Sequence, residues 1–487
     1  MMKIRCFKWL GLSLGLLSGE LLWAQSVDLI PSPVLPVPTQ AQIRWHRMEM
    51  NAFIHFSLNT FTNKEWGYGD ENPELFNPQK FDPEQWVNVL SESGFKGIIL
   101  TAKHHDGFCL WPTAYSEHSV KKAFWREGGG DVVGSLARAS RSKGLQFGIY
   151  LSPWDCNHKD YGRKEYIQYY RNQIGELLEQ YGPFFEIWID GANGGRGYYG
   201  GARETRWIDR QTYYDWPVTL EMIKEKNPDV LVFSDAGPDI RWVGNERGEA
   251  GETNWNLLTP DTLYPGKGGI EKLLQSGSES GTHWIPAECD VSIRPGWFYH
   301  SAEDSLVKTP EELFQIYLHS VGRGSVLLLN VPPNSDGLIS STDIQSLKGF
   351  KHILDSVFKN NLAAEAHFSA SNTRLNSGFF SPDNLHDNSP ETFWATDDGV
   401  TQARVELKFP KPIRPHYVVL QEYIALGQRV KSFTLEAWTG KSWKSVFQGT
   451  TIGYKRIAVL PEIETDKLRL IIHDSRACPV LSEVAVY

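Results

Sequence analysis

The sequence has few cysteines and no excess of positive charge. Only five of its 487 residues are Cys, and no two of them form a CxxC pair. Four of them, Cys109, Cys156, Cys289 and Cys478, lie far apart beyond the N-terminal segment, so we expect buried free thiols. The formal net charge of −9 argues against nucleic acid or an anionic membrane as the main partner.

Two signatures of common enzyme classes are also missing. No HxH or HExxH spacing is present, so the histidines do not follow a zinc-site pattern. No glycine-rich phosphate loop follows the first predicted strand, which argues against a dinucleotide-binding sheet.

A long apolar run occurs only at the N-terminus. Residues 1–24 contain three basic residues, then an apolar stretch interrupted by Glu20, then Ala24 before Gln25. This pattern is typical of a secretory signal peptide and is too short for a membrane span. We therefore expect a secreted or periplasmic protein without membrane insertion.

Apolar strand patterns alternate with amphipathic helix patterns over most of the chain. This alternation predicts a parallel sheet covered by helices, and seven strands within one such region favour a (β/α)8-like TIM barrel, possibly irregular because the eighth strand is not evident. The predicted strands are 50–57, 94–105, 145–153, 184–191, 230–237, 283–293 and 325–333, and the clearest helices are 83–94, 132–144, 165–182, 311–324 and 341–362.

Polar residues at the ends of these strands support the barrel. A barrel gathers the carboxyl ends of all its strands around one pocket, whereas an open sheet does not. The residues in question are His55, His104, His105, Trp154, Asp155, Asp190 and Asp235.

The pattern changes near residue 363. Short alternating strands at 403–410, 416–424, 432–439, 444–449, 456–461 and 467–474 predict an all-β sandwich. We therefore expect a catalytic barrel over 25–362 and a separate sandwich over 363–487.

The adjacent histidines of "TAKHHDGFCLW" admit three interpretations. His104 and His105 could be metal ligands, structural histidines or donors to a bound sugar. Adjacent strand residues point to opposite faces, which disfavours a shared metal. Imidazoles at a barrel mouth suit the hydroxyls of a polyol, so we favour sugar binding.

In "IWIDGANG", Asp190 ends an apolar strand two positions after Trp188, so both side chains face the same way. Asp-Gly is also a common turn, but a carboxylate above an indole on a barrel rim suits a nucleophile beside a sugar ring.

Six segments, in this order, resemble the α-L-fucosidases of glycoside hydrolase family 29. They are "FIHFS", "EWGYGD", "TAKHHDGFCLW", "IWIDGANG", "DAGPDIRWVGNE" and "RPGWFYH". The last three are similar to the subgroup that acts on α-1,3/1,4-linked fucose. In the tail, "FSPDNLHDNSPETFWAT" resembles discoidin-like (F5/8 type C) carbohydrate-binding sandwiches, which often hold a structural Ca²⁺.

The resemblance implies a retaining mechanism with no cofactor and no catalytic metal. It implies Asp190 as the nucleophile, and "GNE" points to Glu246 as the acid/base, with Glu249 and Glu252 as alternatives in the same loop. The segment at 194–211 looks long for the family, so spacing does not decide among the three. The implied sugar contacts are His55, Glu65, Trp66, His104, His105, Trp188 and Trp297.

The expected function is therefore a retaining exo-α-L-fucosidase that releases α-1,3/1,4-linked fucose from branched, Lewis-type glycans. Three alternatives remain open: a broad-specificity α-L-fucosidase, a barrel hydrolase for another sugar, and a fucose lectin with a dead barrel. The expected partners are fucosylated oligosaccharides or glycoconjugates.

Overall fold

The computed structural model describes residues 29–191, 195–199 and 201–487. The predicted signal peptide, residues 1–24, lies outside the described residues and stays a prediction. Within the described ranges, no helix is both long and apolar enough to cross a membrane.

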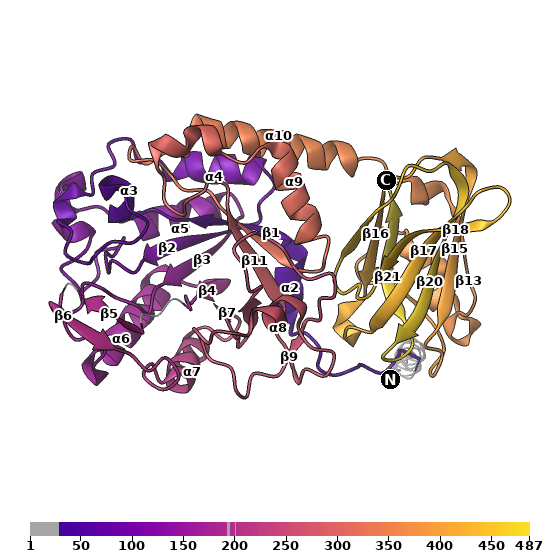
Figure 1. Ribbon diagram of the computed structural model, residues 1–487, viewed down its shortest axis with the longest axis horizontal. Coiled ribbons are helices and arrows are strands. Elements are labelled where there is room, and N and C mark those ends of the chain that lie inside the picture. Colours follow the sequence, from indigo (N-terminus) through magenta and orange to yellow (C-terminus); the bar gives the residue numbers. More distant parts are fainter. Residues whose placement is uncertain (1–28, 192–194, 200) are drawn as a thin grey trace, which may run out of the picture.

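Eight parallel strands close into a barrel, as the sequence predicts (Figure 1). Neighbouring strands follow the order β1-β12-β11-β8-β7-β4-β3-β2, and β2 pairs back onto β1. The strands are β1 (Met50–Ile54), β2 (Gly97–Lys103), β3 (Gln146–Leu151), β4 (Glu186–Trp188), β7 (Leu231–Ser234), β8 (Ile240–Trp242), β11 (Ala287–Ser292) and β12 (Val326–Asn330).

The strand that the sequence does not reveal is β8. It has three residues and follows β7 with no helix between them. Its central residue, Arg241, is fully buried and donates to the carbonyl oxygens of Leu274 and Trp255 at 2.8 and 2.9 Å. A buried cation inside a three-residue strand breaks the apolar run by which strands are recognised. The single strand predicted at 283–293 is likewise wrong in extent, because it divides into β10 (His283–Trp284) and β11.

Helices surround the barrel and start at well-defined caps. Asp82 caps α4 through the backbone N–H groups of Glu84 and Gln85, and Thr309 forms a capping box with Glu312 at the start of α9. The larger helices are α2 (Gln40–Met48), α4 (Pro83–Glu92), α5 (Val132–Ser142), α6 (Lys164–Tyr181), α7 (Trp216–Lys226), α9 (Pro310–His319) and α10 (Ser341–Val357).

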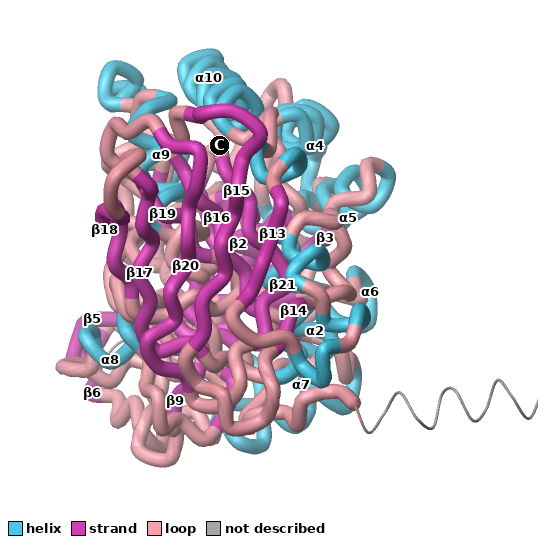
Figure 2. Tube along the Cα trace, turned by 90° about the vertical axis from the view of Figure 1, so that its right-hand side faces the viewer, coloured by secondary structure: helices cyan, strands magenta, loops and turns pink. Residues whose placement is uncertain are grey.

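After α10 the chain forms a β-sandwich. Figure 2 shows its five-stranded sheet across the front of the view, in the order β13-β15-β20-β17-β18. The other sheet has the order β14-β21-β16-β19. The strands are β13 (His367–Ala370), β14 (Trp394–Ala395), β15 (Ala403–Ile413), β16 (Tyr417–Glu422), β17 (Val430–Trp438), β18 (Trp443–Gly449), β19 (Arg456–Val459), β20 (Thr465–Ser475) and β21 (Val480–Val486).

Charged and amide side chains join the sandwich to the barrel. Glu252 of the barrel forms ion pairs with Arg323 and with Arg456 of β19, the latter at 2.6 Å. Gln428 accepts from the backbone N–H of Asn256 at 2.8 Å and donates to a neighbouring barrel carbonyl at 2.9 Å. These paired contacts fix the sandwich against one side of the barrel.

Candidate active site

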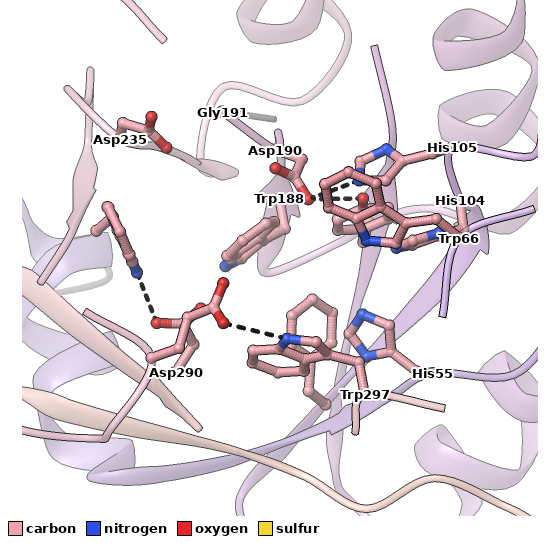
Figure 3. A pocket seen from close by; sticks show the side chains of 14 residues that line it. His55, Trp66, His104, His105, Trp188, Asp190, Gly191, Asp235, Asp290 and Trp297 are labelled. Carbon is pink, nitrogen blue, oxygen red and sulfur yellow. Dashed lines mark hydrogen bonds and ion pairs between the residues drawn. The ribbon is translucent and has the colours of Figure 1, made fainter. Parts of the chain in front are cut away.

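A cavity of about 390 Å³ opens at the carboxyl ends of the barrel strands (Figure 3). Its volume falls in the range of small-molecule sites. Aromatic rings and acidic or imidazole side chains line it, and among the described lining residues there is no Lys or Arg. The lining residues are Phe53, His55, Trp66, His104, His105, Tyr150, Trp188, Asp190, Gly191, Asp235, Trp242, Glu246, Asp290 and Trp297.

Asp190 follows β4 and keeps about one fifth of its side chain exposed to the cavity. The Tyr150 hydroxyl donates a hydrogen bond to Asp190 Oδ2 at 2.8 Å. Burial, together with the Asp190 charge, raises the pKa of Tyr150 well above its usual value, so the phenol keeps the proton that it donates. Asp190 is thus oriented by a neutral donor while it faces the cavity.

His105 faces the same carboxylate as an uncharged ring. Burial lowers the pKa of His105 to about 3. Ser152 Oγ donates to the carbonyl oxygen of Trp154 at 2.7 Å, so it accepts from His105 Nδ1 at 2.7 Å. The Nε2 atom therefore carries no proton, and its 3.7 Å separation from Asp190 Oδ2 is not an ion pair.

His55 and His104 are also neutral. Burial lowers the pKa of His55 to about 3 and that of His104 well below its usual value. His55 Nδ1 lies 2.8 Å from Oδ1 of Asn330, whose amide group donates to Ser292 and to the Trp297 carbonyl oxygen. His55 Nδ1 is thus the donor, which leaves Nε2 as an acceptor. His104 Nδ1 is buried without a partner among the described residues. Neutral imidazoles with free nitrogens can bind sugar hydroxyls.

Indole rings form the walls of the cavity. Trp188 stacks on Phe233 with ring centroids 4.0 Å apart and planes within 9°. Trp66, which is 57% exposed, packs edge-on against His105 and Trp154. Flat apolar faces beside polar groups suit a pyranose ring, which has an apolar face and hydroxyl edges.

Of the three glutamates that the sequence left open, only Glu246 lines the cavity. Burial, and to a lesser extent the negative charges of Asp190 and Glu65, raise the pKa of Glu246, whereas a 3.4 Å hydrogen bond from Trp297 Nε1 lowers it. Glu249 pairs with Arg247 at the surface, and Glu252 is held at the sandwich interface. Glu246 is therefore the carboxyl placed to carry a proton into the cavity.

A column of indole–carboxyl pairs runs through the barrel interior toward Glu246. In each pair the tryptophan N–H donates to a carboxyl oxygen at 2.8 to 3.4 Å. The pairs are Trp45–Glu186, Trp188–Glu288, Trp242–Asp290 and Trp297–Glu246.

Burial favours the protonated form of the deeper acids in this column. Burial raises the pKa of Glu186 to about 8, and burial with the Glu186 charge raises that of Glu288 well above its usual value. Burial and the charge of Glu246 likewise raise the pKa of Asp290. The column therefore holds Trp188 and Trp242 in place without accumulating negative charge beneath the cavity.

Asp235 lies beside the segment that follows β4. A Cβ atom at Gly191 would lie 1.9 Å from an Asp235 oxygen, so a larger residue there would require the Asp235 carboxyl group to move. Burial raises the pKa of Asp235 to about 7, against a hydrogen bond from the Gly266 N–H at 2.9 Å. Asp235 thus links the Asp190 segment to the loop at residue 266.

The structure brings eight of the nine predicted site residues to the cavity, and Glu65 is the exception. Its carboxylate accepts from the backbone N–H groups of Trp297 and Phe298 at 2.8 and 3.1 Å, and His300 Nε2 lies 2.6 Å away. Glu65 holds the loop that carries Trp297, and its direct contact with sugar stays a prediction.

Three lining residues with ionisable side chains, Tyr150, Asp235 and Asp290, were not predicted to be functional. Asp235 stood out only as a strand end, and Tyr150 was hidden within an apolar strand. Asp290 gave a usable signal, since an acid inside the apolar run "AECDVSI" is costly unless it has a partner. Asp155 does not reach the cavity, because it forms a buried ion pair with Lys103 at 3.0 Å.

Two further expectations concern metals and thiols. Within the described ranges, no group of three or more His, Cys, Asp or Glu side chains could hold a metal ion. The expected Ca²⁺ in the sandwich therefore gains no support from such a cluster. Cys109, Cys156, Cys289 and Cys478 are buried free thiols, as predicted.

The family model described as "Alpha-L-fucosidase" matches residues 34–356. The chain is 41% identical to "Alpha-L-fucosidase 1" of Arabidopsis thaliana over 462 residues, covering 94% of this chain and 88% of the relative.

Solved structures agree with this match. A putative α-L-fucosidase from Bacteroides thetaiotaomicron superposes with a TM-score of 0.86 at 39% identity, covering 94% of this chain and 99% of that one. A Ruminococcus gnavus fucosidase of glycoside hydrolase family 29, solved in complex with fucose, has a TM-score of 0.85 at 32% identity, covering 94% and 96%. The barrel, its acidic cavity and these matches together place the chain in the α-L-fucosidase family, glycoside hydrolase family 29.

Proposed function

We propose that the protein is an exported, retaining exo-α-L-fucosidase that removes α-1,3- or α-1,4-linked fucose from branched, Lewis-type glycans. The observation that carries the proposal is the placement of Asp190 and Glu246 in one cavity with different surroundings. Asp190 accepts a hydrogen bond from Tyr150, while burial favours the protonated form of Glu246.

In the first step Asp190 attacks the anomeric carbon of fucose. The bond from that carbon to the leaving oxygen breaks, and Glu246 gives its proton to this oxygen. The products are a fucosyl ester on Asp190 and the free alcohol of the remaining glycan. Glu246 is then a carboxylate.

In the second step Glu246 takes a proton from water as the water oxygen attacks the same carbon. The ester bond to Asp190 breaks, and fucose leaves with its original anomeric configuration. Both carboxyl groups return to their starting protonation, so the cycle needs no metal or cofactor.

The neutral histidines hold the sugar without competing for the acid/base proton. His55 and His105 can each accept a hydrogen bond from a sugar hydroxyl at Nε2, and neutral His104 can accept or donate one. Trp66 and Trp188 offer flat faces. Charged imidazoles would instead pair with Asp190 and weaken it as a nucleophile.

The linkage preference rests on the surroundings of Glu246. Because Glu246 protonates the leaving oxygen, the remainder of the glycan lies on its side of the cavity. Trp242 and Trp297 line that side, each tethered through its indole N–H. Binding of a galactose branch there would position the glycosidic bond for attack. Residues 192–194 of the expected rim loop lie outside the described residues.

The test compares purified enzyme on a Lewis trisaccharide, on 2-linked and 6-linked fucosides and on 4-nitrophenyl α-fucoside. We expect kcat/KM to be highest on the branched trisaccharide. Comparable kcat/KM on all these substrates would contradict the linkage preference and indicate a broad-specificity fucosidase. Binding of fucose without release from any substrate would favour a lectin.

Export is tested separately. We expect the N-terminal sequence of protein recovered from the periplasm or medium to begin near Gln25. Retention of the full leader in the cytoplasm would contradict this part of the proposal.

A further inference from the structure

A two-stranded hairpin stands in the segment that follows the Asp190 strand. It consists of β5 (Arg196–Tyr199) and β6 (Glu204–Trp207), and it lies at the end of the molecule remote from the sandwich (Figure 1). Arg196 pairs with Trp207, and Tyr198 pairs with Thr205. Because directly opposed residues in an antiparallel pair share a face, these four side chains form one face of the hairpin. We call it the outer face.

The opposite face anchors the hairpin to the loop after β3. The Tyr199 ring is fully buried, with its centroid 4.7 Å from that of Tyr161. Arg206 donates to the carbonyl oxygens of Lys159 and Tyr161 at 2.7 and 2.5 Å. The hairpin is therefore held on a loop at the carboxyl end of the barrel, which is the end that carries the cavity.

The outer face leaves two large rings in solvent. Tyr198 is 58% exposed and Trp207 is 70% exposed. The two occupy diagonal positions across the pair, which places large side chains within reach of each other. A strand pair whose inner face is buried and whose outer face carries exposed rings points to an external ligand.

Hydrogen bonds connect the hairpin with a loop of the cavity wall. Asn157 donates to the Gly69 carbonyl oxygen at 2.8 Å, and the Gly201 N–H donates to the Cys156 carbonyl oxygen at 3.0 Å. The turn at 156–157 therefore joins the hairpin to the loop of Trp66 and Tyr68, which are 57% and 64% exposed. The hairpin is thus held, through this turn, to the loop that supplies Trp66 to the cavity lining.

We propose that the outer face of the hairpin binds the oligosaccharide chain of the substrate, at sugar units beyond those next to the scissile bond. This inference rests on the proposed function. The rings of Tyr198 and Trp207 would stack on pyranose faces, while Arg196 and Thr205 would donate to hydroxyls. The face carries one cation, Arg196, and no carboxylate, so it offers hydrogen-bond donors to glycan oxygens beside the two rings.

The experiment uses the full chain and two substrates with the same fucosylated terminal unit, a Lewis trisaccharide and a long poly-N-acetyllactosamine chain. Wild type is compared with Tyr198→Ser, Trp207→Ser and the double variant. Phe379→Ser, which removes a 79% exposed ring of the sandwich, is the matched control. The measured quantity is the ratio of kcat/KM on the long and short substrates.

We expect the double variant to lower this ratio by roughly threefold to tenfold, since each stacking contact contributes a modest free energy. Its kcat/KM on the trisaccharide should match that of wild type and of Phe379→Ser. An unchanged ratio in the double variant would overturn the inference. A lower ratio in Phe379→Ser alone would also overturn it. A change of the double variant from dimer to monomer with no change in the ratio would assign the face to self-association instead. Failure of wild type on both substrates would refute the proposed function, which is a separate outcome.

Discussion

Glu246 and Glu252 lie in one loop, six residues apart, yet the structure uses them in opposite ways. Glu246 faces the cavity and accepts a hydrogen bond from the neutral indole of Trp297. Glu252 lies where the barrel meets the sandwich, and it pairs with the guanidinium groups of Arg323 and Arg456. A glutamate is thus a candidate acid at the cavity and a structural link at the interface between the barrel and the sandwich.

The difference lies in the partners that each region offers. At the sandwich interface the Glu252 carboxylate pairs with two guanidinium groups, and these ion pairs hold two parts of the chain together. At the cavity, the described lining offers indole, phenol and imidazole groups, and burial opposes the charged form. Burial away from cations therefore keeps a proton available on Glu246, whereas the ion pairs of Glu252 serve to hold the sandwich on the barrel.

The largest effect is expected from removal of the nucleophile. Asp190→Ala should lower kcat by about 10⁴-fold or more without unfolding the protein, because no other group can form the covalent intermediate. Added azide should partly restore turnover and yield a fucosyl azide of inverted configuration, measured by NMR. Retained activity in this variant would remove Asp190 from the mechanism.

The second-largest effect on activity is expected from substitution of the acid/base among the loop glutamates. Glu246→Ala should lower kcat/KM on a natural oligosaccharide by about 10²- to 10⁴-fold, the usual contribution of a general acid/base. The loss should be smaller with a 4-nitrophenyl leaving group, which needs little protonation. Glu249→Ala and Glu252→Ala are the controls, and we expect nearly unchanged turnover. The reverse pattern would reassign the acid/base.

Breaking the interface should change stability rather than chemistry. Arg456 is buried with only 3% of its side chain exposed, so Arg456→Met leaves Glu252 without this partner and should lower the free energy of unfolding by about 1–3 kcal/mol. Arg414→Met is the matched control, since its pair with Glu464 is exposed and should contribute less than about 1 kcal/mol. Both variants should keep wild-type kcat. A lower kcat in Arg456→Met would mean that the sandwich takes part in catalysis.

A smaller effect concerns pH. Glu246 acts as an acid, so activity falls as the pH rises through its pKa. The Trp297 N–H favours the carboxylate and lowers that pKa, so Trp297→Phe should raise it. We expect the basic limb of the kcat/KM profile to move to higher pH, while the acidic limb stays in place. A shift to lower pH would show that the indole acts on Glu246 in another way.

The smallest effect is expected at Asp290. Burial and the charge of Glu246 raise the pKa of Asp290 well above the usual value, which favours the uncharged side chain. Asp290→Asn keeps the oxygen that accepts from Trp242 Nε1 at 2.8 Å and should leave kcat/KM within about twofold of wild type. Asp290→Ala is the contrasting variant, because it leaves the Trp242 indole N–H without this acceptor. It should lower kcat/KM by more than Asp290→Asn does. A tenfold loss in Asp290→Asn would mean that a charged Asp290 is required.

Much of the fold follows from local patterns. The helices predicted at 83–94, 132–144 and 165–182 correspond to α4, α5 and α6 within two residues at each end. Their apolar spacing and caps involve residues only a few positions apart, so neighbouring residues suffice to define them. β8 escaped prediction because its buried Arg241 is satisfied by carbonyl groups from distant loops.

The sequence by itself determined that polar residues end the barrel strands, and therefore which side chains gather at one mouth. It could not choose among Glu246, Glu249 and Glu252, because all three are loop carboxyls with similar neighbours in sequence. Only the tertiary structure decided, by burying Glu246 beside Trp297 and placing Glu252 against Arg456 of the sandwich. The protonation of a carboxyl depends on its burial and on the charges near it, and both come from residues far away along the chain.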